Sequence, residues 1–154
     1  MTLRPIHTSD LPGLLTLCRD HAAYEGLDFS ESDQIGRWKQ AFFGTSPRLF
    51  GWVIEGTPLQ GYMTATIDFA TWDARPFVYL DCLYLRPEAR CSGHGRRLMT
   101  ALSQFAKTQG CAEIQWQTPP GNTGGIAFYR ALAARELPKQ RFALSVVPVA
   151  EDAP

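Results

Sequence analysis

Glycine and arginine are concentrated in one short stretch, Arg90 to Arg97, which contains Gly93, Gly95 and Arg96 between an apolar run and an amphipathic segment. The first N–H groups of a helix have no partner within the helix, and the helix dipole is positive there. Glycines without Cβ let an anion approach the backbone closely. The spacing, Arg-x-x-Gly-x-Gly, differs from the GxxxxGK[ST] and GxGxxG nucleotide motifs. The stretch therefore predicts an anion site at a helix N-terminus, with an ordinary strand-to-helix turn as the alternative.

The elements on either side of this loop would position it. Phe77–Leu85 is a dense apolar and aromatic run typical of a buried strand, and Pro87 ends it. Apolar residues with helical spacing follow at Leu98, Ala101, Leu102, Phe105 and Ala106. Lys107 lies in the last turn and Gly110 follows it, as expected at a helix C-terminus.

The rest of the chain reads as alternating strands and helices. The predicted strands cover residues 3–6, 49–55, 59–70, 77–85, 111–118 and 142–149. The other predicted helices run from a cap at Thr8 or Ser9 to Gly26, from a capping box of Ser30 and Asp33 to Gly44, and from Ile126 to Ala134. This order predicts an α+β fold with a mixed, mostly antiparallel sheet flanked by helices. We expect a single domain over residues 1–150 and a loose tail at 151–154.

The composition of the chain argues against several classes of function. The chain has 154 residues and zero net charge, which argues against bulk electrostatic binding of nucleic acid or membranes. It has no apolar run of transmembrane length, and its N-terminus lacks the apolar core of a signal peptide. The four cysteines show neither CxxC spacing nor clustered histidines. We therefore expect a cytoplasmic protein with reduced thiols and no metal site.

The loop, the strand before it and the helix after it resemble motif A of the GNAT N-acetyltransferases. The order of elements matches that family along nearly the whole chain. Within the family, the diamine acetyltransferases of the spermidine/spermine type are the most similar, through stretches at residues 22–26, 42–47, 61–85 and 126–134. The resemblance implies acetyl-CoA as cosubstrate, a splayed strand pair that holds it, and a possible homodimer.

The resemblance also implies how acetyl-CoA is held. Backbone groups at Leu83 and Leu85 would pair with the pantetheine arm like an added strand, and the loop would bind the pyrophosphate mainly through N–H groups. The implied cofactor-binding residues are Leu83, Tyr84, Leu85, Arg90, Cys91, Gly93, His94, Gly95, Arg96, Asn122 and Tyr129. His94 is expected to contribute its backbone rather than to act as a base. Asn122 either contacts the CoA arm or caps a helix.

Two catalytic roles follow from the same resemblance. Tyr129 would protonate the departing CoA thiolate, a role that suits a phenol with a pKa near 10. Asp81 would relay the proton of the acceptor amine through water. The implied substrate-binding residues are Glu25, Trp72, Asp73 and Asp81. Cys82 stands where these enzymes usually have a second acidic residue, so one negative charge is missing from the substrate side.

Each of these residues also has an ordinary structural role as its alternative. Tyr129 is compatible with a packed aromatic residue, Asp81 with a strand carboxylate paired with arginine, and Trp72 with a surface loop. The expected function is acetyl transfer from acetyl-CoA to a primary amine of a small molecule, such as a diamine, a polyamine or a lysine-like amino acid, within a ternary complex. The alternatives are acetylation of a peptide α-amine and a non-catalytic acyl-CoA sensor.

Overall fold

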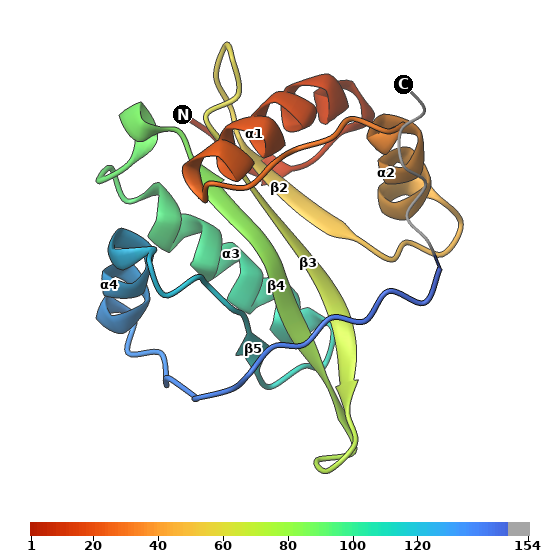
Figure 1. The fold of residues 1–154 in the computed structure, drawn as a ribbon, viewed down its shortest axis with the longest axis vertical. Coiled ribbons are helices and arrows are strands. Elements are labelled where there is room, and N and C mark those ends of the chain that lie inside the picture. The colour runs from red at the N-terminus through yellow and green to blue at the C-terminus, as the bar shows by residue number, and fades with distance from the viewer. Residues whose placement is uncertain (148–154) are drawn as a thin grey trace. The chain divides into compact units, whose positions relative to one another are not determined.

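The computed structural model describes residues 1–147, which belong to two compact units, residues 1–119 and the residues from 120 onward (Figure 1). The predicted tail at 151–154 lies outside the described residues, and a single domain over residues 1–150 stays a prediction. None of the helices within residues 1–147 combines the length and the apolar character needed to cross a membrane.

The first unit is organised around a five-stranded sheet with the order β1-β2-β3-β4-β5. The strands are β1 (Leu3–Pro5), β2 (Phe50–Ile54), β3 (Gly61–Ala70), β4 (Arg75–Leu85) and β5 (Ile114–Gln115). All neighbours are antiparallel except β4 and β5, which are parallel. The mixed, mostly antiparallel sheet is therefore confirmed. The strand predicted over residues 111–118 is too long, because only Ile114 and Gln115 pair with β4.

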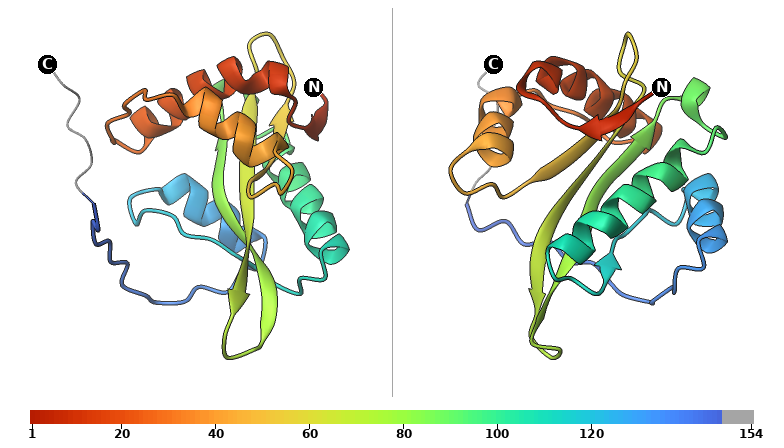
Figure 2. Two further views of the ribbon diagram at one scale, coloured as in Figure 1. Left: turned by 90° about the vertical axis from the view of Figure 1, so that its right-hand side faces the viewer. Right: turned by 180° about the vertical axis from the view of Figure 1, so that it is seen from behind.

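Helices cover both faces of this sheet (Figure 2). They are α1 (Leu11–Tyr24), which follows a 3-10 turn at Thr8–Asp10, α2 (Gln34–Phe43) and α3 (His94–Thr108). On one face, Leu14 of α1 and Phe42 of α2 share a core cluster with Val53. On the other face, the Phe105 ring of α3 packs 4.8 Å from that of Phe50 and 5.2 Å from that of Trp52. Successive side chains of β2 alternate between these faces, as a pleated strand requires.

Glycines end α1, α2 and α3 as predicted, but three predicted helix starts are wrong. Neither Thr8 nor Ser9 is an N-cap, because His7 is the N-cap of the 3-10 turn and Asp10 that of α1, and the last helix begins at Thr123 rather than Ile126. Gly26 and Gly110 follow α1 and α3 with left-handed φ values of 70° and 72°, and Gly44 is the C-cap of α2. The capping box of Ser30 with Asp33 does not form, since α2 begins at Gln34 and Asp33 is itself the N-cap. Asp33 adopts φ 53° and makes no side-chain cap, so the box residues lie a turn too early to serve the helix.

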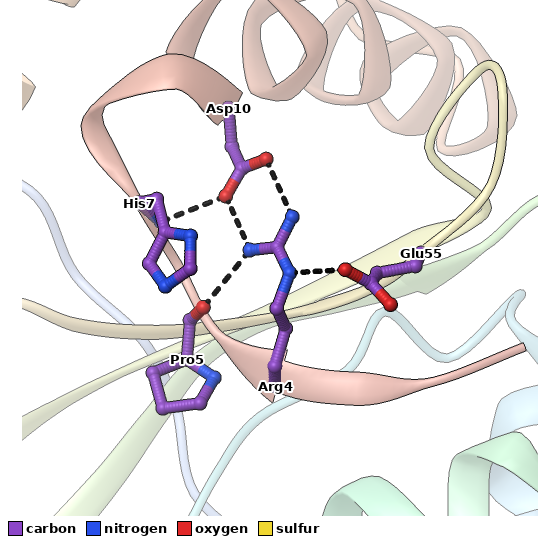
Figure 3. A network of polar contacts seen from close by, with 5 residues as sticks. All are labelled: Arg4, Pro5, His7, Asp10 and Glu55. Carbon is purple, nitrogen blue, oxygen red and sulfur yellow. Dashed lines mark hydrogen bonds and ion pairs between the residues drawn. The ribbon is translucent and has the colours of Figure 1, made fainter.

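A partly buried ion-pair network ties β1 to the start of α1 and the end of β2 (Figure 3). The Arg4 guanidinium donates to both carboxylate oxygens of Asp10, at 2.7 and 3.0 Å, and its Nε donates to Glu55 at 2.5 Å. Asp10 Oδ2 also accepts from the His7 N–H at 2.7 Å. The hydrogen bond from Arg4 holds the pKa of Asp10 below its usual range. Arginine thus neutralises both carboxylates of this network.

The second unit contains α4 (Thr123–Ala131) and a segment without regular structure up to residue 147. The strand predicted over residues 142–149 is wrong for its described part, residues 142–147, and its last two residues lie outside the described chain. Phe142 and Leu144 are 90% and 88% exposed. An alternating apolar pattern makes a strand only where a neighbouring strand supplies hydrogen bonds, and within residues 120–147 the structure contains none.

Candidate active site

Strand β4 separates from β5 soon after the two strands meet. Val78 pairs with Ile114 and Tyr79 with Gln115, and no further pair is formed between these strands. Within residues 1–147, the part of β4 from Leu80 to Leu85 therefore has β3 on one edge and no paired strand on the other. An unpaired edge of this kind can accept an extended ligand as an added strand. Leu83 and Leu85, predicted to bind the pantetheine arm through their backbone, lie on it.

The predicted anion loop leads directly into α3. Gly93 is the N-cap, with a left-handed φ of 81°. The first bond of the helical ladder runs from Arg97 N to Gly93 O, at 3.1 Å. The amides of His94, Gly95 and Arg96 precede that bond, so they lie at the positive end of the helix dipole with no intrahelical acceptor. The order of strand, glycine loop and helix N-terminus thus produces the arrangement of backbone donors that an anion site requires.

Two side chains of this loop have structural contacts of their own. The His94 ring is buried, and its Nδ1 lies 3.1 Å from Nη1 of Arg97, which also donates to the Met1 carbonyl. Burial and the neighbouring Arg97 lower the pKa of His94. A buried, uncharged ring agrees with the expectation that His94 contributes its backbone. Arg96 and Cys91 are exposed at the surface of the loop.

Arg90 connects the end of β4 to α1. Its Nε donates to the Leu85 carbonyl at 2.9 Å, and its guanidinium lies 4.7 Å from the centre of the Tyr24 ring and 5.5 Å from that of Tyr84. These cation–π contacts hold the guanidinium between the anion loop and the end of α1. The predicted phosphate ligand is therefore also a packing residue.

Asp81 is the extra residue of a β-bulge. Thr64 of β3 pairs with Cys82, and the next residue, Ala65, pairs with Leu80, so Asp81 has no partner across the strand. A bulge turns a side chain away from the regular alternation, and Asp81 is exposed. Asp81 therefore lies at the start of the unpaired stretch of β4, whose far end leads into the anion loop.

The neighbouring thiol is a neutral hydrogen-bond donor. Cys82 Sγ donates to Asp81 Oδ2 at 3.7 Å. Burial, with a smaller effect from the Asp81 charge, raises the pKa of Cys82 to about 12. The uncharged Cys82 thiol therefore does not replace the charge of the acidic residue that related enzymes usually have at this position. It donates a hydrogen bond to the Asp81 carboxylate instead.

Glu25 lies at the C-terminal end of α1 beside a histidine. Its Oε1 is 3.2 Å from Nε2 of His21, whose Nδ1 is 2.8 Å from the hydroxyl oxygen of Tyr62. The His21 ring also stacks on Tyr84, with centroids 5.1 Å apart and planes at 20°. Burial lowers the pKa of His21 and outweighs the opposite effect of the nearby Glu25 and Asp81 carboxylates.

Trp72 and Asp73 do not lie beside these groups. Both are exposed at the tip of the β3–β4 hairpin, and Trp72 is 99% exposed. At about 3.3 Å per residue, roughly 20 Å of strand separate Arg75 from Asp81. Trp72 and Asp73 at the hairpin tip therefore belong to a surface separate from the one around Asp81 and Cys82.

Asn122 and Tyr129 belong to the second unit. The Asn122 side chain accepts a hydrogen bond from Gly125 N at 3.2 Å, so it caps α4, one of the two predicted alternatives. Tyr129 lies on α4, partly buried, with its ring 5.4 Å from that of Phe128. Contact with the CoA arm and with the departing thiolate stays a prediction for these two residues.

The family model for the acetyltransferase (GNAT) family matches residues 14–133 of this sequence, well over half of its length. The chain belongs to the acetyltransferase (GNAT) family. It is therefore an acetyltransferase, and GNAT acetyltransferases use acetyl-CoA. The recognition made from the anion loop and its flanking elements is confirmed.

Curated relatives of this GNAT chain act on small molecules. It is 28% identical over 148 residues to a thialysine N-epsilon-acetyltransferase of Bos taurus, which covers 88% of this chain and 84% of the relative. It is 25% identical over 136 residues to an L-methionine sulfoximine/L-methionine sulfone acetyltransferase of Pseudomonas aeruginosa, covering 85% and 78%.

Solved structures show the same fold. An aminoglycoside acetyltransferase from an uncultured soil metagenomic sample has a TM-score of 0.76 at 20% identity, with 94% of this chain and 96% of that chain covered. An aminoglycoside N-acetyltransferase in complex with CoA has a TM-score of 0.73 at 19% identity, with 95% and 100% covered.

The residues present fit acetyl-CoA. The amides at the start of α3 would bind its phosphates, and the unpaired edge of β4 would hold its extended arm. Within residues 1–147, no group of histidine, cysteine and carboxylate side chains is arranged to hold a metal ion. His21 and Tyr62, whose contacts hold Glu25, were not predicted from the sequence. The spacing of His21 and Glu25, four residues apart on one helix, could have indicated the first of these.

Proposed function

We propose that this GNAT enzyme transfers an acetyl group from acetyl-CoA to a primary amine of a small molecule that carries a second cationic group, such as a diamine or a lysine-like amino acid. The observation that carries the proposal is the position of Asp81. Its exposed carboxylate begins the unpaired stretch of β4 that leads to the anion loop. The relatives named for thialysine and its ε-amine support the same substrate class.

Acetyl-CoA supplies the acetyl group as a thioester. The acceptor must first lose a proton, because an alkylamine with a pKa near 10.4 is neutral only about one part in a thousand at pH 7, a deficit of roughly 4–5 kcal/mol. Asp81 is assigned to accept that proton at its carboxylate through a water molecule. The thiol of Cys82 donates to Oδ2 and would orient this carboxylate.

Tyr129 is assigned to return a proton from its hydroxyl to the departing thiolate. The backbone amides at the start of α3 and the guanidinium of Arg90 are assigned to the pyrophosphate. The amine attacks directly, so Cys91 has no nucleophilic role. A homodimer belongs to the same proposal, rests on the family resemblance alone, and is tested by sedimentation in solution. The cytoplasmic location stays the expectation drawn from composition.

The test is a thiol-release assay with acetyl-CoA and a panel containing a diamine, spermidine, lysine analogues and a peptide with a free α-amine. The expected result is the highest kcat/KM on a diamine or a lysine analogue, with a rate that rises with pH until the bound amine is deprotonated. Highest efficiency on the peptide, with negligible turnover of every diamine and lysine analogue, would replace this proposal with peptide acetylation.

A further inference from the structure

His21 is held in place from three sides at the end of α1. Its Nδ1 lies 2.8 Å from the Tyr62 hydroxyl, its Nε2 lies 3.2 Å from Glu25 Oε1, and its ring stacks on Tyr84. Tyr62 belongs to β3 and is 2% exposed, and Tyr84 belongs to β4 and is 7% exposed. The two strands therefore fix the plane of the imidazole, and the plane fixes the direction in which Nε2 points.

The surroundings also determine which nitrogen carries the hydrogen. The Glu25 carboxylate can only accept, so a lone pair on Nε2 would face negative charge. An N–H at Nε2 therefore donates to Glu25, and Nδ1 accepts from the Tyr62 hydroxyl. Burial raises the pKa of Tyr62 well above its usual value, which keeps that hydroxyl protonated and able to donate.

This arrangement does not suit a base. Both ring nitrogens already have hydrogen-bond partners. The partner of Nδ1 is the hydroxyl of the buried Tyr62, which offers a proton no route to water. The titratable groups around the ring are Glu25 at the end of α1, Tyr62 from β3, and Asp81 and Tyr84 from β4, while Cys18 and Cys82 interact with Tyr62. Burial among them favours the uncharged imidazole.

A neutral donor orients a carboxylate without cancelling its charge. The other ion pairs within residues 1–147 all use arginine, which neutralises the acid that it holds. Glu25 differs, because its partner is a histidine kept uncharged by burial. Its full negative charge is thus held in a defined direction, with 23% of the side chain exposed.

We infer that His21 is a positioning residue that holds Glu25 to bind the second ammonium group of the acceptor. This rests on the proposed function, which supplies an acceptor with two cationic groups. It also offers an explanation for Cys82: where the second acid of the substrate side is absent, a single oriented carboxylate selects acceptors with one distal charge. His21 itself does not contact the substrate.

Two substitutions separate the two hydrogen bonds of the ring. The amide of glutamine can place an N–H where Nε2 stands, whereas the amide of asparagine can place an acceptor where Nδ1 stands. His21→Gln is expected to keep the bond to Glu25, and His21→Asn is expected to lose it. The assay compares butane-1,4-diamine with butylamine, which has the same length but lacks the second charge.

We expect His21→Asn and Glu25→Gln each to raise the KM for the diamine by about tenfold, the loss of about one charge-assisted hydrogen bond. In His21→Asn, kcat, the kinetics with butylamine and the acetyl-CoA affinity should stay at the wild-type level. His21→Gln should remain within about threefold of wild type. The double variant His21→Asn/Glu25→Gln should be no worse than Glu25→Gln, because both changes remove one interaction.

Glu31→Gln is the matched control, since it removes an exposed carboxylate paired with Arg19 and should change none of these constants. An unchanged diamine KM in His21→Asn overturns this inference and leaves the proposed function intact. So does an equal loss with diamine and butylamine in both His21 variants, accompanied by a lowered melting temperature, which indicates a packing role only. A wild-type enzyme that acetylates neither these two amines nor any lysine analogue refutes both proposals together.

Discussion

The two ends of the unpaired part of β4 present different kinds of polar groups. At the Leu85 end, the start of α3 presents backbone amides from consecutive residues. At the Asp81 end, the polar groups are side chains that come from α1, β3 and β4. A phosphate has the same geometry in every nucleotide cofactor, so fixed backbone donors suffice for it. An acceptor amine differs between enzymes, and side chains can change without disturbing the fold.

A histidine at each end illustrates the difference. His94 is buried beside Arg97, and Nδ1 is the ring atom with a described partner. His21 uses both nitrogens, one toward the core and one toward an acidic side chain. Both pKa values are lowered by burial, yet arginine reinforces that effect at His94, whereas carboxylates oppose it at His21. The same residue type thus supports packing at one end and charge orientation at the other.

The strongest test of the backbone end is Gly95→Leu. Gly95 is the second residue of α3, so leucine fits its helical backbone while adding bulk where the phosphate approaches. We expect calorimetry to detect no acetyl-CoA binding by a protein that remains folded. Thr100→Leu, which adds similar bulk at an exposed position further along α3, should bind normally. Unchanged acetyl-CoA affinity in a folded Gly95→Leu protein would refute the proposed phosphate site at the start of α3.

Tyr129→Phe removes a hydroxyl and leaves the backbone donors untouched. If this phenol is the general acid, kcat should fall by about 10²–10⁴, while acetyl-CoA affinity stays near wild type. The measurement is steady-state kinetics together with calorimetry on the same preparation. Wild-type turnover in this variant would assign the proton to water or to another group.

Cys82→Asp tests whether charge at the Asp81 end selects the acceptor. The site around Cys82 favours an uncharged group, since burial raises the pKa of the thiol to about 12. The gain in preference for spermidine should therefore be moderate. We expect the ratio of kcat/KM for spermidine over a diamine to rise by about tenfold, equivalent to about 1.4 kcal/mol. Cys82→Asn, of similar size but uncharged, should leave the ratio unchanged. An equal shift in both variants would indicate shape rather than charge.

The smallest expected effect is on stability against pH. Both histidines have folded-state pKa values lowered from 6.5, so the folded protein binds fewer protons than the unfolded chain. Their contribution is complete above about pH 6.5 and is lost as the pH falls toward the folded-state values, by at most about 1.4 kcal/mol per pH unit for each histidine.

Urea unfolding between pH 7.5 and 5.5 measures this slope. His94→Gln and His21→Gln should each flatten it, because each removes a group whose pKa is lowered in the folded protein. An unchanged slope in either variant would show that the replaced histidine titrates alike in the folded and the unfolded chain.

Much of the sheet and one end of the site could be predicted because their signals are local. The anion loop needs only glycine spacing between a strand and a helix, and Gly26 and Gly110 end their helices by their own left-handed φ. Two failures concern strands that depend on a pairing partner. The stretch 111–118 contributes two residues to the sheet, and residues 142–147 form no strand despite their apolar alternation.

The sequence by itself determined the family, the order of the elements up to α4 and the backbone donors of α3, since each follows from residues that are neighbours in the chain. Only the tertiary structure decided that Asp81 occupies a bulge, that β4 parts from β5 after Tyr79, and that the Tyr62 hydroxyl reaches His21. These features depend on register and on contacts between residues as far apart as positions 21 and 62. Local spacing carries no information about register, because a slip by one residue turns every side chain of a strand to the opposite face.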